Sequence, residues 1–314
     1  MSKSRSTSAR RAGVVLAILA ALVLAALGCD KGQQQQQTVA RKKPARYVVP
    51  AEFDRELNRF EVDSLRSMKE THGITRDEYW DGYGGVLASD AIEVWYPVGK
   101  VNVLQGVAMF KLAAEARQKV TDVFGRAPAG HAVIICSPNL EWYQYNTGRD
   151  WWIYSAIKGD TISVQAPIDL HTRGLLKIVG PREYYEWAIG RLSDGHAPRW
   201  VEEGCASYLA GEAVILEDQR QDFAALGAVA ISPSETERVL AAEKERRETR
   251  RAYYNAYRMI EELVKKRGET SMAEWVNDMA TEPDLDAATR KAFNEDYVAL
   301  CKEASSWAAT EASP

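Results

Sequence analysis

The stretch that most constrains the fold is residues 181–212, PREYYEWAIGRLSDGHAPRWVEEGCASYLAGE. It predicts two helices separated by a turn at residues 195–198, because Pro181 suits the first turn of a helix and Gly-His-Ala-Pro is typical of a turn. Residues four positions apart lie on one face of a helix, so Arg182 and Glu186 point in the same direction. The first predicted helix therefore presents two opposite charges side by side.

The sequence after this turn resembles a helix of the gluzincin metallopeptidases, the peptidase MA-like, thermolysin-like class. In that family the zinc motif His-Glu-x-x-His is followed by a helix that reads P-R-W-x-x-E-G-x-A-x-Y. The chain matches this helix at Pro198, Arg199, Trp200, Glu203, Gly204, Ala206 and Tyr208. In such enzymes the two histidines bind one zinc ion, the glutamate between them activates a bound water, and a glutamate of the next helix completes the site.

The zinc motif itself is degenerate in this chain. Alignment on Glu203 places it on residues 182–186, so Arg182 and Glu186 stand at the histidine positions, whereas Glu183 and Glu203 keep the family's residue types. Arginine stays protonated near neutral pH and has no lone pair to offer a metal. We expect its guanidinium to pair with Glu186 and Glu203, because carboxylates buried around an empty metal site would otherwise be costly. The alternative is that Arg182 and Glu186 form a solvated surface pair.

The resemblance implies a metallopeptidase-like domain without catalytic residues or cofactor, which binds a peptide or protein partner or scaffolds an assembly. In these peptidases an edge strand binds extended substrates through backbone hydrogen bonds, a mode that needs no metal. Residues 162–167, ISVQAP, are the expected edge strand. On a later helix, the resemblance makes Tyr253, Tyr254 and Tyr257 candidate cleft residues, whereas tyrosines at helical spacing are more often part of a core.

Two other functions are open to this sequence. An active metallohydrolase would draw its ligands from Glu183, Glu186, Glu203, His171 and His196. Such a carboxylate-rich set suits manganese or magnesium better than zinc. A thiol mechanism would use Cys205 as the nucleophile and one of the two histidines as the base, whereas the simpler interpretation of Cys205 is a small buried residue.

The N-terminus predicts export and lipid attachment. Residues 1–28 combine a basic start with an apolar run over residues 14–27, and Gly28 precedes Cys29, a pattern that resembles a bacterial lipoprotein signal. It departs from that pattern at Ala26, where leucine is usual. The alternative is an uncleaved anchor helix, but the apolar run is short for a membrane span. We expect an extracytoplasmic lipoprotein of the cell envelope, anchored to a membrane through Cys29.

Charge and cysteine content exclude further classes. Removing residues 1–28 takes away four basic residues and no acidic ones, so the 40 basic and 44 acidic residues become 36 and 44, a net charge of −8. This balance argues against nucleic acid as a partner. Without Cys29, the cysteines Cys136, Cys205 and Cys301 allow at most one disulfide.

The remaining sequence predicts an α+β fold, with a small mixed sheet and a long helix followed by a helical half, and the resemblance implies that this fold is zincin-like, of the gluzincin-like kind. Residues 29–50 predict a flexible Gln-rich tether and residues 51–90 a helical preamble. Residues 91–307 predict the peptidase MA-like domain, with an α/β part to residue 167 and a helical part from residue 168. The α/β part has expected strands at 92–97 and 131–138, a helix at 103–124, and a hairpin of residues 151–158 and 161–166.

Overall fold

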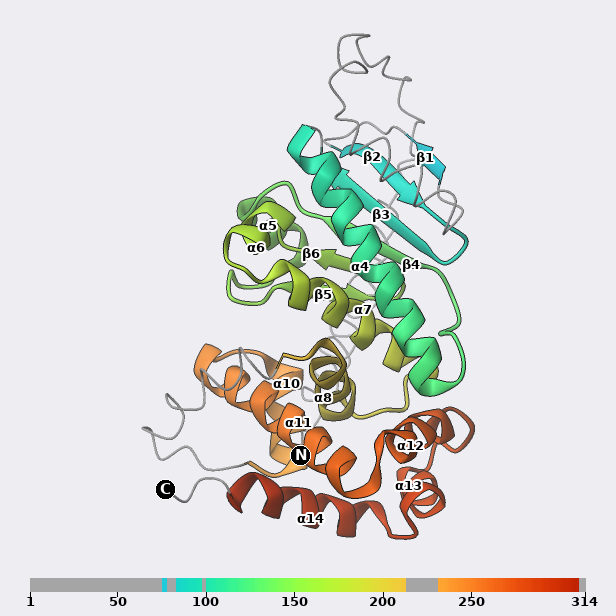
Figure 1. The fold of residues 1–314 in the computed structure, drawn as a ribbon. Coiled ribbons are helices and arrows are strands. Elements are labelled where there is room, and N and C mark those ends of the chain that lie inside the picture. The colour runs from blue at the N-terminus through green and yellow to red at the C-terminus, as the bar shows by residue number, and fades with distance from the viewer. Residues whose placement is uncertain (1–74, 78–82, 98–99, 213–230, 311–314) are drawn as a thin grey trace, which may run out of the picture. The chain divides into compact units, whose positions relative to one another are not determined.

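The computed structural model describes residues 75–77, 83–97, 100–212 and 231–310 (Figure 1). These residues form an α+β fold with one six-stranded mixed sheet and a larger helical part, as the sequence predicts at that level. The predicted signal peptide, the tether with Cys29, and residues 51–74 of the predicted preamble lie outside the described residues. None of the helices that the structure describes is both long and apolar enough to cross a membrane.

The sheet has the strand order β1-β2-β3-β4-β6-β5. Strands β3, β4 and β6 run parallel to one another, whereas the pairs β1–β2, β2–β3 and β5–β6 are antiparallel. Alternate residues of β3 and β4 are buried, as expected for strands with one face on a core. The strands are β1 (Thr75–Asp77), β2 (Tyr83–Ala88), β3 (Ile92–Pro97), β4 (Ala132–Cys136), β5 (Ser155–Lys158) and β6 (Thr161–Val164).

Helix α4 (Lys100–Phe124) connects the parallel strands β3 and β4, which a hairpin could not join. It packs against β3 on one side and against helix α7 (Leu176–Leu192) on the other. Met109, Phe110 and Val120 of α4 are fully buried in this core. The predicted helix at residues 103–124 is thus confirmed, and α4 positions the helix that carries Arg182.

Two expectations about the sheet and the segment before it are wrong. The C-terminal end of the predicted helical preamble is strand, because β2 pairs with β3 and buries Val86 and Leu87. The expected edge strand at residues 162–167 contributes β6, which lies between β4 and β5, so the edge strand is β5. Helix α6 (Pro167–Thr172) follows the sheet and ends before Gly174, which adopts a positive φ of 72°.

Helix α7 begins five residues before Pro181, so Pro181 lies inside the helix and not in its first turn. Proline cannot donate its backbone hydrogen bond within a helix. The preceding apolar residues compensate, because Leu176 and Val179 are buried in the same core as α4. Gly180 also allows close packing, since a Cβ atom there would lie 3.1 Å from Leu112 and 3.3 Å from Met109 of α4.

The helical part is built around α8, which packs between α7 and α11. Gly204 makes this approach possible, because a Cβ atom at that position would lie 2.4 Å from the carbonyl oxygen of Ala256 on α11. The charged segment of residues 235–266 does not form one helix, because it is interrupted at Glu243, which adopts a left-handed conformation. Besides α5 (Leu140–Thr147), the remaining helices are α8 (Arg199–Ala210), α10 (Pro233–Ala242), α11 (Arg246–Arg267), α12 (Glu269–Thr281), α13 (Leu285–Phe293) and α14 (Tyr297–Thr310).

Candidate functional site

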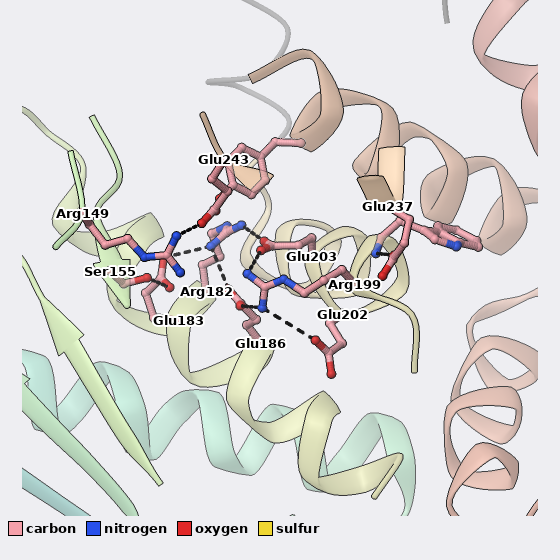
Figure 2. A network of polar contacts seen from close by, with 12 residues as sticks. Arg149, Ser155, Arg182, Glu183, Glu186, Arg199, Glu202, Glu203, Glu237 and Glu243 are labelled. Atoms are coloured by element: carbon pink, nitrogen blue, oxygen red, sulfur yellow. Dashed lines mark hydrogen bonds and ion pairs between the residues drawn. The ribbon is translucent and has the colours of Figure 1, made fainter. Parts of the chain in front are cut away.

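The contact between α7 and α8 encloses a cluster of charged side chains (Figure 2). Arg182, Glu183 and Glu186 come from α7, and Glu203 comes from α8. All four are buried, with exposed fractions of 7%, 2%, 6% and 1%. The solvated surface pair considered for Arg182 and Glu186 is therefore wrong.

Arg182 lies at the centre of this cluster and contacts four carboxylates. Its Nη1 donates to Glu183 Oε1 at 2.9 Å and to Glu186 Oε2 at 3.4 Å, and its Nη2 donates to Glu203. Its Nε donates to Glu212 Oε2 at 3.0 Å. The predicted pairing of Arg182 with Glu186 and Glu203 is confirmed, and each of the three guanidinium nitrogens donates to at least one glutamate side chain.

Arg199 supplies a second guanidinium to the same carboxylates. Its Nη1 lies 2.8 Å from Glu186 Oε1, and its Nη2 lies 2.8 Å from Glu203 Oε1. Glu186 and Glu203 therefore each bridge two arginines, one oxygen per arginine. The sequence predicts no role for Arg199 beyond its match to the family helix, although its position four residues before Glu203 is a signal for this ion pair.

Residues from distant parts of the chain complete the network, and the sequence gave no means of finding them. Ser155 of β5 donates a hydrogen bond to Glu183. Arg149 pairs with Glu243, whose other carboxylate oxygen accepts a hydrogen bond of 2.5 Å from the Tyr253 hydroxyl. Glu243 is placed there by the break between α10 and α11.

Burial governs the ionisation of the cluster. It raises the pKa of Glu183 to about 7, with Arg182 opposing the shift. It raises the pKa of Glu203 to about 8, helped by Glu186 and opposed by the two arginines. Burial alone would lower the pKa of Arg182, but the surrounding carboxylates, led by Glu203, keep that pKa well above its ordinary value. The arginine thus stays charged while two of its partners take up protons near neutral pH.

These pKa values predict that the free energy of unfolding falls as pH rises. An unfolded glutamate ionises at its ordinary pKa, whereas Glu183 and Glu203 hold protons in the folded chain up to pKa values of about 7 and about 8. The folded state therefore binds more protons between about pH 5 and about pH 8, and rising pH destabilises it through these groups. Urea unfolding across this range measures the slope. Glu203→Gln cannot ionise and should flatten it; an unchanged slope in that variant would contradict the assignment.

A cavity of about 310 Å³ opens beside the cluster. Its walls are residues 152–157, the buried charged residues of α7 and α8, and Leu240, Ala241, Glu243, Arg250 and Tyr253. Of the three tyrosines expected at the cleft, Tyr253 lines this cavity, and its ring lies 5.2 Å from the Arg182 guanidinium carbon. Tyr254 and Tyr257 do not line it, and Tyr257 is buried with its hydroxyl donating to Glu261 at 2.8 Å.

The outer edge of β5 faces this cavity. Tyr154 accepts a backbone hydrogen bond from Gln165 at 2.9 Å, and pairing in an antiparallel ladder alternates. The backbone groups of Ser155 and Ile157 therefore point away from β6, toward an edge with which no other described strand pairs. A second cavity of about 280 Å³ shares Ile157, Glu186 and Arg199 with the first. The two cavities, which share Ile157 of β5 as a wall residue, are together called the groove below.

The donors proposed for a metallohydrolase do not converge. Within the ranges that the structure describes, no three His, Cys, Asp or Glu side chains are grouped so that they could hold a metal ion. His171 is exposed on α6, and the Nδ1 of His196 lies 3.0 Å from the carbonyl oxygen of Met279. No observation of the described residues supports the metallohydrolase alternative.

The three described cysteines are free thiols. Cys205 is completely buried in the core, and burial raises its thiol pKa. A nucleophilic cysteine needs an accessible thiolate, so Cys205 fits the packing interpretation and not the thiol mechanism.

Comparison with known proteins adds no relative. No protein-family model matches the chain, and no curated protein matches it significantly.

Proposed function

We propose that this chain is an extracytoplasmic lipoprotein whose metallopeptidase-like domain is catalytically inactive and binds an extended peptide or a protein segment. One observation is the main support for the proposed lack of catalytic activity. The Arg182 guanidinium lies among Glu183, Glu186 and Glu203, at a position where the resembled family has a zinc-binding histidine. A fixed positive charge thus stands where that family binds a metal ion.

The residues present do not fit zinc. Arginine offers no lone pair, and both oxygens of Glu186 and of Glu203 already accept hydrogen bonds from guanidinium groups. Binding a metal would require Arg182 to leave its buried partners, and breaking a buried ion pair costs about 3–5 kcal/mol. The proposed binding function therefore requires no metal ion.

The groove supports the binding part of the proposal. An extended peptide can add to an exposed strand edge through main-chain hydrogen bonds, with specificity coming from pockets for its side chains. The outward backbone groups of Ser155 and Ile157 provide such an edge, and Trp152, Ile153 and Leu240 provide apolar wall beside it. The lipoprotein pattern ending at Cys29 would tether this groove to a membrane.

Metal analysis and a peptidase assay on the full-length chain, purified in detergent, test the proposal. We expect no stoichiometric zinc after incubation with zinc and gel filtration, and no cleavage of a quenched fluorescent random peptide library. Thermolysin handled in parallel is the positive control for both readouts. One equivalent of bound zinc together with peptide cleavage would overturn the proposed loss of catalysis.

A further inference from the structure

Three arginines contact two aromatic rings, and one of these rings, that of Tyr154, lines the cavity. The guanidinium carbon of Arg173 lies 4.9 Å from the centre of the Tyr154 ring, and that of Arg246 lies 4.4 Å from the Trp151 ring. Arg250 lines the cavity and interacts with the Tyr154 side chain. These residues, Arg173, Arg246 and Arg250, are called the arginine cluster below.

The arginine cluster has no acidic partner among the described residues. No carboxylate oxygen there lies within 4.0 Å of any of the three guanidiniums. Within the described ranges, the one side chain to which Arg173 donates is the neutral Gln165, at 3.2 Å, and the Nε of Arg246 is buried without a hydrogen-bond partner. Burial, followed by the neighbouring Arg246 and Arg173, lowers the pKa of Arg250. Among the described residues the three guanidiniums therefore have no direct ion pair, whereas the glutamates of the cavity wall pair with Arg149, Arg182 and Arg199.

Two members of the cluster stand where positive charge is unfavourable. Arg246 begins α11 and Arg250 follows one turn later. The N-terminal end of a helix carries a partial positive charge, so cations there are repelled and an anion is attracted. Stacking on Trp151 and Tyr154 orients two of the guanidiniums, and a planar guanidinium held in this way is suited to bidentate binding of a carboxylate.

We propose that the arginine cluster binds a carboxylate of the peptide held along β5, so that the ligand of the groove is an acidic extended peptide. Tyr154 directly precedes Ser155, the first residue of β5, so a peptide paired with this edge reaches the cluster as it passes the start of the strand. This inference rests on the proposed peptide-binding function. It adds the chemical class of the ligand, an acidic peptide, and the requirement for an acidic residue at one fixed position of that peptide.

Selection from a random heptapeptide library displayed on phage, using the full-length chain in detergent, tests the inference. We expect Asp or Glu to be enriched at one fixed position of the selected peptides. Arg250→Gln should weaken binding of a selected peptide at least about tenfold, the effect of losing a hydrogen bond to a charged group. Arg247→Gln is the matched control, because Arg247 is exposed on the same helix and carries the same charge. Selected peptides without acidic enrichment, or equal binding by the Arg250→Gln chain, would overturn the inference.

Two further experiments are needed. One distinguishes a C-terminal from a side-chain carboxylate, and the other distinguishes failure of peptide binding from failure of carboxylate binding. Synthetic copies of a selected peptide with a free or amidated C-terminus distinguish a terminal from a side-chain carboxylate. If the library yields no peptide, the proposed function fails. Calorimetric titration with N-acetyl-L-glutamate then tests separately whether the arginine cluster binds a carboxylate. Heat of binding in the unmodified chain that is lost in Arg250→Gln supports a carboxylate site. No heat, or tighter binding of inorganic phosphate, rejects it.

Discussion

Replacing Arg182 and Glu186 together with histidine is expected to give a chain that binds one equivalent of zinc. The two positions lie four residues apart on α7, so the imidazoles would leave the same face of the helix. Glu203 of α8 already lies against the Arg182 side chain and would supply the third ligand. Two histidines and one glutamate form a zinc site of the catalytic type, with a fourth position open to water. Metal analysis after gel filtration measures the uptake.

The matched control is Arg182→His with Glu186→Gln, which lacks the second imidazole and should retain far less zinc. Chelation by EDTA should also lower the melting temperature of the double-histidine chain and leave the control unchanged, because a ligand that binds only the folded state stabilises it. A double-histidine chain that has the helical circular dichroism of the unmodified chain but retains no zinc would show that α7 and α8 do not have the geometry of a zinc-binding helix pair.

Local spacing explains which part of the site could be predicted from the sequence. The pairing of Arg182 with Glu186 follows from helix periodicity, and the pairing with Glu203 follows from the need to partner buried carboxylates. Arg199 and Glu203 have the same four-residue spacing, so their ion pair could also be predicted from the sequence. The α+β class likewise follows from alternating strand and helix patterns that give way to helices alone.

The contacts that the sequence did not predict depend on tertiary structure. Arg149 and Glu243 are far apart in the chain, and Glu243 reaches the site only because a left-handed residue interrupts a segment with helical periodicity. The edge position of β5 depends on β6 pairing with β4, which hydrophobic patterning within the hairpin cannot reveal. Pro181 lies inside α7 because burial of Leu176 and Val179 outweighs the local preference for starting a helix at proline.

Arg182→Gln is expected to be the most destabilising single substitution in the buried network. It leaves Glu183, Glu186, Glu203 and Glu212 without the cation that they share, and removing one partner of a buried ion pair costs about 3–5 kcal/mol. In a domain of this size the loss corresponds to a fall in melting temperature of roughly 6–20 °C. Urea unfolding at about pH 8 measures the loss where the carboxylates are most ionised.

The pH dependence of this loss distinguishes an electrostatic role for Arg182 from simple packing. Glu183 and Glu203, with pKa values of about 7 and about 8, take up protons as pH falls, and removing the guanidinium raises both pKa values further. The difference between Arg182→Gln and the unmodified chain should therefore shrink as the pH is lowered toward about 5.5. Arg238→Gln is the control, because its pair with Glu235 is exposed to solvent, and ion pairs of this kind contribute little to stability. A loss no larger than in the control, or one that is constant with pH, would show that Arg182 does not neutralise the buried carboxylates.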